Sequence, residues 1–357
     1  MDHTTKVANL QAINTDKTTI DKLLKEFKHS LFITPQWVES MAIDGCKPIY
    51  LQFTNANNKV VGFHAGLIVK GSSLQGTQLY FYAGPAIADN DTNLFEACLI
   101  ALRIFAKENG FTKISIRPFD QQLTTACNPR GYRRTNSAEY IYEYNKDEEI
   151  RLSYGFKKNI KKGRKTGAKL LSSQHQRELH TLFSLIDQTH TLRVDKYGND
   201  YNPLGLLNLS KESLTRLLET DLGVLYYVEV DQTIHCIQLC LEDESRNYAL
   251  LMGSNEFAYQ NGLGSFLDFS VEENLKDKGF KYINLGSVPH ENDGGAGLIQ
   301  YKEAMGCKRF NSYGYYTYFL TYPHRLFNPL YKLGNHLPDN RIVSSLKSMV
   351  SKLISKN

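Results

Sequence analysis

One stretch of the chain concentrates cationic side chains densely enough to bind anions. Residues 156–169 contain seven cations: Lys157, Lys158, Lys161, Lys162, Arg164, Lys165 and Lys169. The whole chain has 42 basic and 37 acidic residues and a net charge of +5, so this stretch could account for the entire excess. Ammonium and guanidinium groups at this density can hold phosphates. We therefore expect an anionic substrate to bind Lys158, Lys161, Lys162, Arg164 and Lys165. A solvated helical face or a contact with an anionic membrane would also fit. On the other side of this helix, Tyr154, Phe156 and Ile160 are expected to anchor it to the core.

Two further segments could bind or move charge. Gly262 and Gly264 stand where an apolar helical pattern begins, and the free N–H groups at a helix N-terminus attract phosphate or carboxylate. A loop that needs flexible residues is the alternative. His290, Glu291 and Asp293 lie in a later polar loop. One of them could accept the proton that an attacking amine must lose, whereas a solvated loop would give them no role.

The elements that must position these residues occur twice. Residues 107–116 and 276–285 match at an offset of 169 positions, and the helical apolar positions upstream keep the same register. Glycines stand at equivalent points of the two copies: Gly84 and Gly253 end strands, and Gly110 and Gly279 follow helices. The position after a helix is often left-handed, which favours glycine. The second copy holds six extra residues near residues 290–297.

Hydrophobic periodicity predicts the same order of elements in both copies. In the first copy we expect helices near 18–28 and 35–43, strands near 48–54, 58–69 and 78–83, a helix at 92–108, and strands at 112–117 and 138–145. In the second we expect helices near 152–166, 175–192 and 210–220, strands near 223–230, 233–242 and 246–252, a helix at 262–277 and a strand at 280–286. This order predicts an α/β fold in which mixed sheets are flanked by helices. The expected domains are 1–150 and 151–322, followed by a helical tail at 323–357.

The duplicated order resembles two tandem GNAT-like domains, the architecture of Fem-type peptidoglycan aminoacyltransferases and related cell-envelope N-acyltransferases. Residues 156–170 are similar to the basic helix and following strand of that family. Residues 282–287 and 297–306 are similar to its strand ending in glycine and its G-L-x-x-[FY]-K-x-x-x-G helix. The long helical arm that some members associate with tRNA is absent here, which favours other acyl donors. Tyr259 stands at the polar first position of the GNAT pyrophosphate loop, so the donor stays open.

The resemblance implies an active site in the second copy. It assigns catalysis to Lys302 in the motif helix. We add the neighbouring Tyr301 and, from the polar loop, Glu291 as catalytic candidates, and we expect Gly253, Gly262 and Gly264 to bind the donor. A cation at Lys302 could stabilise the oxyanion of acyl transfer, and the first copy has Cys127 at the equivalent position, 175 residues earlier. The alternative is an exposed surface lysine. We expect Lys302→Met to keep the fold and melting temperature but to lose transfer.

The remaining sequence features indicate where the protein works. The polar N-terminus has no signal-peptide pattern, no apolar run is long enough to span a membrane, and the six cysteines lack metal-site spacing. We expect a cytoplasmic protein with reduced, buried thiols. Residues 342–356 form an amphipathic pattern that would pack on the body or lie on a membrane. Contact with the inner face of the membrane could then involve this tail and the basic helix.

Three functions remain open at this point. The first is N-acyl transfer to an amino group of a nucleotide- or lipid-linked cell-envelope precursor, a polysaccharide or a peptidoglycan. The second is aminoacyl-tRNA-dependent peptidoglycan bridge formation. The third is a non-catalytic double-GNAT module that binds an anionic polymer or a membrane. No tightly bound cofactor and no metal are expected, and acyl-CoA or aminoacyl-tRNA would serve as co-substrate.

Overall fold

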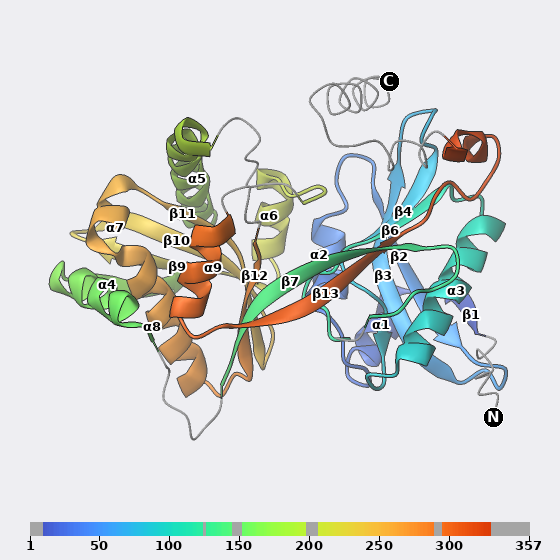
Figure 1. Cartoon of the computed structure of the whole chain (residues 1–357), viewed down its shortest axis with the longest axis horizontal. Coiled ribbons are helices and arrows are strands. Elements are labelled where there is room, and N and C mark those ends of the chain that lie inside the picture. The colour runs from blue at the N-terminus through green and yellow to red at the C-terminus, as the bar shows by residue number, and fades with distance from the viewer. Residues whose placement is uncertain (1–9, 124–125, 145–151, 198–205, 289–294, 330–357) are drawn as a thin grey trace. The chain divides into compact units, whose positions relative to one another are not determined.

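The computed structural model describes residues 10–123, 126–144, 152–197, 206–288 and 295–329. The chain divides into two compact units (Figure 1). Unit 1 comprises Met1–Ser137 and Ser312–Asn357, and unit 2 comprises Ala138–Asn311. Among the described helices, none is both long and apolar enough to cross a bilayer.

Unit 1 is a mixed sheet with its long helix on one face. Its elements are β1 (Gln11–Asn14), α1 (Lys17–Leu23), α2 (Pro35–Ser40), β2 (Lys47–Thr54), β3 (Val60–Lys70), β4 (Thr77–Phe81), β5 (Ala86–Ile87), α3 (Thr92–Glu108) and β6 (Lys113–Ile116). Strands β1 to β4 pair antiparallel in chain order, and β4 pairs in parallel with β6. The helix α3 begins at Asp91, whose carboxylate accepts from the N–H groups of Asn93 and Leu94.

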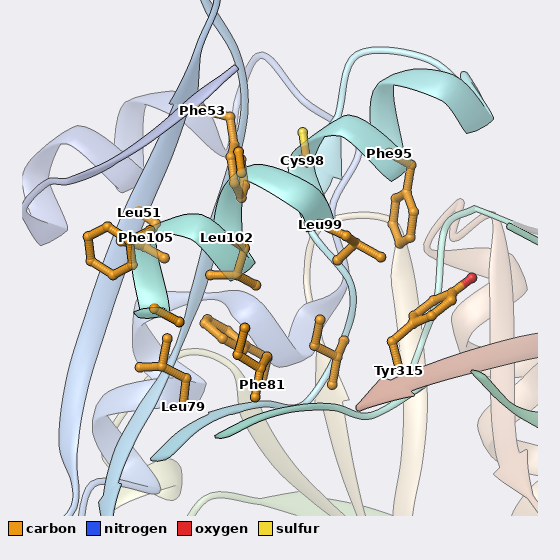
Figure 2. Close-up of a cluster of buried hydrophobic side chains, with 14 of the residues drawn as sticks. Leu51, Phe53, Leu79, Phe81, Phe95, Cys98, Leu99, Leu102, Phe105 and Tyr315 are labelled. Atoms are coloured by element: carbon orange, nitrogen blue, oxygen red, sulfur yellow. The ribbon is translucent and has the colours of Figure 1, made fainter. Parts of the chain in front are cut away.

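The core of unit 1 lies between α3 and the strands. Figure 2 shows one face of α3, with Phe95, Cys98, Leu99, Leu102 and Phe105, directed at the apolar side chains of the sheet. The sheet contributes Leu51, Phe53, Leu79 and Phe81, and Tyr315 closes the cluster beside Phe95. The spacing of the α3 residues places them on one helical stripe, so burial of this stripe fixes the helix on the sheet.

Unit 2 repeats the plan with more helices. Its elements are α4 (Tyr154–Lys165), β8 (Lys169–Ser173), α5 (Gln176–Tyr197), α6 (Lys211–Leu218), β9 (Gly223–Val230), β10 (Thr233–Glu242), β11 (Arg246–Ser254), α7 (Glu256–Asn261), α8 (Leu263–Asp277), β12 (Tyr282–Ser287) and α9 (Gly295–Ala304). Strands β8 to β11 pair antiparallel in the order β8-β9-β10-β11, and β11 pairs in parallel with β12. The helices α4 and α8 share an apolar cluster with one face of this sheet.

The predicted repeat is confirmed as a structural unit. Both copies contain a parallel strand–helix–strand unit, β4-α3-β6 and β11-α8-β12. Gly110 and Gly279 follow the two helices with φ angles of +74° and +81°, as the sequence predicts. The copies differ by one step in register, because Leu79 pairs with Ile114 whereas its equivalent, Tyr248, pairs with Asn284.

The last strand of each sequence copy pairs with a strand of the other copy. Strand β7 (Arg133–Glu143) ends the first copy, yet its residues 139–143 pair with β12 in unit 2. Strand β13 (Lys308–Tyr316) ends the second copy, yet Tyr315 and Tyr316 pair with β6 in unit 1. The compact units therefore have other boundaries than the sequence domains 1–150 and 151–322, because each final strand finds its hydrogen-bonding edge outside its own copy.

Candidate functional site

The parallel strands of unit 2 part shortly after they begin to pair. Strand β11 pairs with β12 over Arg246–Tyr248 and Tyr282–Asn284, and β11 then continues along β10 as far as Ser254. On its other side β12 pairs with β7, with a register shift between Asn284 and Ser287. The backbone of residues 285–287 therefore needs partners other than a regular ladder.

Lys302 supplies those partners from α9. Its Nζ atom donates to the carbonyl oxygens of Leu285 at 2.6 Å, Gly286 at 3.0 Å and Ser287 at 2.9 Å. An ammonium has three N–H donors, so this geometry uses all of them. The residue is only 5% exposed, and burial lowers the pKa of its ammonium to about 8. Lys302 is therefore not the exposed surface lysine of the alternative interpretation.

A buried carboxylate lies near Lys302, at the point where β11 and β12 separate. Glu139, on β7, accepts hydrogen bonds from Tyr248 Oη and Asn284 Nδ2, both at 3.1 Å. The Oδ1 atom of Asn284 accepts from the N–H of Gly286 at 2.8 Å. Gly286 has φ +71°, and a Cβ atom there would lie 3.0 Å from Tyr248 Oη. The site therefore requires glycine at 286, both for its backbone angle and for space.

Tyr301 points to a different partner from its neighbour in sequence. Its hydroxyl donates to Asp268 Oδ2 at 2.6 Å, and Gln238 Nε2 donates to Asp268 Oδ1 at 3.0 Å. Burial raises the pKa of Asp268, and these two hydrogen bonds oppose that shift by stabilising the carboxylate. A Cβ atom on Gly264 would lie 4.0 Å from Tyr301 Oη, so the hydroxyl lies beside the first turn of α8.

The three predicted donor-binding glycines have different surroundings. A Cβ atom on Gly253 would lie 2.8 Å from Leu185 Cβ, because α5 packs closely there. Gly262 has φ +66°, and a Cβ atom there would lie 2.8 Å from the carbonyl oxygen of Asn159 on α4. At Gly264 the nearest atom to such a Cβ is the flexible Cε of Met252, at 3.3 Å. Of the three, Gly264 leaves space beside Tyr301.

The predicted phosphate-binding cations all lie on the solvent side of α4. The side chains of Lys158, Lys161, Lys162, Arg164 and Lys165 are exposed. Phe156 and Ile160 are buried, as expected, but Tyr154 is 85% exposed. The prediction that Tyr154 anchors the helix was therefore wrong: Tyr154 stands two residues before the buried stripe of α4, on the opposite side of the helix.

A groove runs between α4 and the C-terminal half of α8. It has a volume of about 700 Å³ and is lined by Leu152, Lys157, Ile160, Lys161, Arg164, Phe269, Glu273, Lys276 and Asp277. Arg164 lies 3.8 Å from the carboxylate of Glu273, and its guanidinium stands 5.5 Å from the Phe269 ring centre. Lys157 and Lys276 thus line the groove beside the predicted cations Lys161 and Arg164. Leu152, Ile160 and Phe269 supply its apolar lining.

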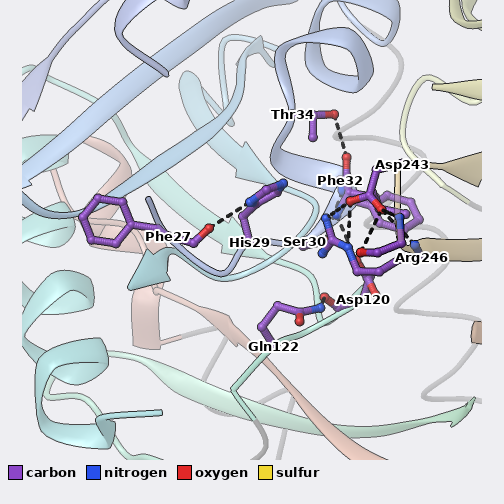
Figure 3. Close-up of polar contacts among 11 residues, drawn as sticks. Phe27, His29, Ser30, Phe32, Thr34, Asp120, Gln122, Asp243 and Arg246 are labelled. Atoms are coloured by element: carbon purple, nitrogen blue, oxygen red, sulfur yellow. Dashed lines mark hydrogen bonds and ion pairs between the residues drawn. The ribbon is translucent and has the colours of Figure 1, made fainter. Parts of the chain in front are cut away.

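Unit 1 uses its buried polar groups to hold backbone. Figure 3 shows the contacts around Ser30: its hydroxyl donates to the carbonyl of Phe119, and Asp120 accepts from the N–H of Leu31, each at 2.9 Å. The equivalent of Lys302 is Cys127, which is buried and lies 3.1 Å from the hydroxyl of Tyr315. The cluster with a buried cation, a tyrosine and carboxylates is thus found in unit 2.

Sequence reasoning missed Glu139, Asp268 and Gln238. Glu139 lies in β7, and no sequence pattern indicates that this strand pairs with β12. Asp268 has a sequence signal, since it interrupts the apolar stripe of α8 between Phe266, Leu267 and Val271, all buried. Glu291, His290 and Asp293 fall outside the described residues, as does the amphipathic tail at 342–356.

Comparison with known proteins relates the fold to solved structures. No family model and no curated protein matches the chain. The structure is similar to that of FemX, with a TM-score of 0.67 and 13% identity over 90% of this chain and 99% of that one. It is also similar to L-PGS from Bacillus licheniformis, with a TM-score of 0.53 and 14% identity over 96% and 98% of the two chains. A conserved protein of unknown function from Bacteroides thetaiotaomicron VPI-5482 has a TM-score of 0.51 and 12% identity over 86% of this chain and 99% of that one.

These similarities extend over nearly the whole of each relative. The prediction of an α/β fold in two tandem GNAT-like parts, in the arrangement of Fem-type proteins, is confirmed. At 12–14% identity, the comparisons establish the fold, and the chemistry must be inferred from the side chains of this chain.

Proposed function

We propose that the protein is an acyltransferase that joins an activated acyl group to an amino group of an anionic cell-envelope precursor. The single observation that carries this proposal is the Tyr301 hydroxyl, held by Asp268 at 2.6 Å beside the first turn of α8 and next in sequence to a buried lysine. The resemblance of residues 297–306 to the Fem-type motif helix supports the same reaction.

The donor is proposed to bind where β11 and β12 separate. Beyond Tyr248, the edge of β11 that faces away from β10 no longer pairs in register with β12, and a strand edge can bind an extended amide chain. The first N–H groups of α8 favour a phosphate or carboxylate nearby, with Gly264 leaving the space. Gly253 and Gly262 serve the site by letting α5 and α4 approach closely. Acyl-CoA and aminoacyl-tRNA are the two donor classes in view.

The reaction needs a neutral amine, a stabilised oxyanion and a leaving group. The amine loses its proton, attacks the acyl carbon to form the C–N bond, and the bond from that carbon to the donor breaks as the leaving group takes a proton. We assign oxyanion stabilisation to the positive charge of Lys302 acting through space, because its three N–H groups already donate to the carbonyls of residues 285–287. We assign to Tyr301 a hydrogen bond to the reacting group and to Glu291 the role of proton acceptor.

The acceptor is proposed to place its anionic groups on α4. Lys158, Lys161, Lys162, Arg164 and Lys165 present five exposed cations there, and phosphates of a nucleotide- or lipid-linked precursor would suit them. Such a reaction would take place in the cytoplasm or at the inner face of the membrane.

The experiment combines ligand identification with turnover. Mass spectrometry of the purified full-length chain would identify a co-purifying donor or precursor, and transfer to amines would then be measured with acyl-CoA and with aminoacyl-tRNA. Tyr301→Phe should reduce turnover strongly, while Tyr322→Phe, at a tyrosine that is 69% exposed, should leave it unchanged. Equal turnover in the two variants would exclude Tyr301 from the reaction, and no transfer from either donor would favour a non-catalytic binding module.

A further inference from the structure

The exposed side of α4 carries a regular stripe in which three of the proposed acceptor-binding lysines follow a tyrosine. Tyr154, Lys158, Lys161 and Lys165 follow one another at spacings of four, three and four residues, which places them on one line along the helix. Phe156, Ile160 and Gly163 form a second line with the same spacing, and all three are buried. The two lines are two residues, or about 200°, apart, so the cationic line faces directly away from the core.

The exposed tyrosine distinguishes this stripe from an ordinary solvated face. Tyr154 is 85% exposed, although its position at the start of the helix would allow a polar residue. Aromatic rings with a polar end are favoured at the boundary between membrane and water, where the ring meets lipid and the hydroxyl meets headgroups. A tyrosine in line with lysines is therefore typical of a surface that meets headgroups.

The neighbouring helix α7 adds to the same kind of surface. It contacts α4 through Lys162, whose Nζ donates to the carbonyl of Gln260. Phe257 is 37% exposed and Tyr259 is 53% exposed on α7. Figure 1 shows α4, α7 and α8 as neighbours in unit 2. Large aromatic side chains thus flank the cations on two helices.

The excess of positive charge on α4 favours a negatively charged partner. The helix carries six cations, Lys157, Lys158, Lys161, Lys162, Arg164 and Lys165, and its sequence contains no acidic residue. Arg164 is the member that lies near a carboxylate, that of Glu273 at 3.8 Å. A surface with several exposed cations attracts a surface of fixed negative charge over about a Debye length.

We infer that the solvent face of α4, with the adjoining aromatics of α7, docks on a bilayer that contains anionic phospholipids. The inference rests on the proposed role of the α4 cations in binding anionic groups, and it identifies those groups as the headgroups of a membrane surface. Docking would bring unit 2 to lipid-linked amines.

Vesicle binding of the full-length chain, measured without any acyl donor, tests this inference. The protein should sediment with vesicles of phosphatidylcholine and phosphatidylglycerol and remain in solution with vesicles of phosphatidylcholine alone. Each lysine near an anionic surface strengthens partition by about fivefold. The triple variant Lys158→Gln, Lys161→Gln, Lys165→Gln should therefore weaken partition by on the order of 100-fold.

Two control variants separate this surface from general charge and from folding. The variant Lys25→Gln, Lys59→Gln, Lys107→Gln removes three exposed lysines from unit 1 and should leave partition close to that of the parent. Tyr154→Ser keeps every charge and should still weaken partition severalfold. All of these side chains are exposed, so thermal melts should match the parent. Equal losses in the two triple variants would overturn the inference, as would an absence of binding to anionic vesicles.

Competition distinguishes a bilayer from other anions. Inorganic pyrophosphate should release the protein from vesicles at the same ionic strength as sodium chloride, because Lys158 and Lys165 of the exposed line do not line the groove between α4 and α8. Release by pyrophosphate at far lower ionic strength would instead indicate a discrete phosphate site and overturn the inference. A single-stranded oligonucleotide provides a further comparison. The inference would also be overturned if the parent bound the oligonucleotide more tightly than anionic vesicles and Tyr154→Ser bound the oligonucleotide as tightly as the parent does.

The result is independent of the transfer assay with soluble amines. Vesicle binding without transfer would leave the docking surface in place and contradict the enzyme proposal. Transfer to soluble amines without vesicle binding would support the enzyme proposal and contradict the docking surface.

Discussion

Lys302 Nζ lies 3.0 Å from the carbonyl oxygen of Gly286, a residue held in the left-handed region with φ +71°. The buried cation and the glycine therefore belong to one hydrogen-bonded arrangement. In it, the Lys302 side chain from α9 replaces the ladder hydrogen bonds that β12 lacks where it separates from β11. Four predictions follow from this cluster and from the carboxylates around it.

Replacing Lys302 by Met should now affect stability as well as transfer. The substitution removes the donor from the carbonyls of residues 285–287, of which Leu285 and Gly286 are buried, and an unsatisfied buried group costs about 1–3 kcal/mol. We expect the free energy of unfolding to fall by roughly 2–4 kcal/mol and the transfer rate to fall because the positive charge is lost. Burial thus changes the expectation from sequence that the melting temperature stays constant. Urea denaturation measures the first effect, with Lys308→Met, at an exposed lysine, as the control. A stability equal to that of the control would contradict the cluster.

Tyr301→Phe should destabilise the protein in a pH-dependent manner. The variant removes the hydroxyl that donates to Asp268 Oδ2 at 2.6 Å, and this bond stabilises the charged carboxylate. Burial already raises the pKa of Asp268 above its ordinary value, and loss of the bond should raise it further. A carboxyl whose folded pKa is raised loses its stabilising contribution as pH rises. The loss relative to the parent should therefore be larger at about pH 7 than at about pH 5. Equal losses at both pH values would contradict this coupling.

Glu272 should make the parent protein less stable as the solution becomes alkaline. The residue is fully buried, and among the described residues neither of its carboxylate oxygens has a hydrogen-bond partner. Burial raises its pKa from 4.5 to about 8, with the nearby charge of Asp268 as the second cause. The folded state therefore keeps a proton that the unfolded state releases. Its stabilising contribution is complete below about pH 4.5 and is lost as pH rises to about 8.

Glu272→Gln should remove this slope, because an amide does not titrate. The variant should be more stable than the parent at about pH 8, by on the order of 1–3 kcal/mol, and close to it at about pH 5. Glu273→Gln changes the exposed neighbour and should keep most of the parental slope. Denaturation curves across this pH range provide the measurement, and a parental slope in Glu272→Gln would show that the carboxyl is not held neutral.

Gly286→Ala should destabilise unit 2 more than Gly279→Ala. Both glycines have positive φ angles, +71° and +81°, but a Cβ atom at 279 meets nothing within 4 Å, whereas one at 286 lies 3.0 Å from Tyr248 Oη. The shared backbone strain costs about 1–2 kcal/mol, and the crowding at 286 adds to it. Tyr248→Phe alone should destabilise the protein, because it removes the hydrogen bond to Glu139, but Gly286→Ala should cost less in that background than in the parent. Thermal melts of the parent and these variants measure both effects, and equal losses at both glycines would exclude the crowding.

Local patterns were sufficient to predict the elements that carry one clear period. The helix at 92–108 and the strands at 223–230 and 233–242 have the predicted bounds. Apolar residues recur at helical spacing in the first and mostly alternate in the second, and the third is a continuous buried run. The short helix α7 and the two-residue strand β5 were missed, since segments of two to six residues hold too few positions to show a period.

The site was predictable only where sequence neighbours form it. Tyr301 and Lys302 belong to one motif, whereas Glu139 meets Asn284 across 145 positions, a contact that no local pattern encodes. The burial of Lys302 could not be predicted either, because it depends on the path of residues 285–287. Tyr154 shows the opposite limit: an aromatic residue near a helix start suggests burial, yet its helical position faces solvent.

The exchange of final strands sets the order in which the protein can be completed during synthesis. Unit 1 needs Tyr315 and Tyr316 beside β6, although the rest of its described sheet ends at Ile116. The residues of unit 2, 138–311, leave the ribosome between these two parts. Unit 2 is in effect a domain inserted into unit 1, so the first half to be translated is the last to close its sheet. An N-terminal fragment that ends near residue 150 would lack the strand that pairs with β6 in unit 1. It would also contain residues 139–143, which pair with β12 in unit 2. The two sequence copies therefore cannot be separated at the boundary between them without removing a strand from each unit.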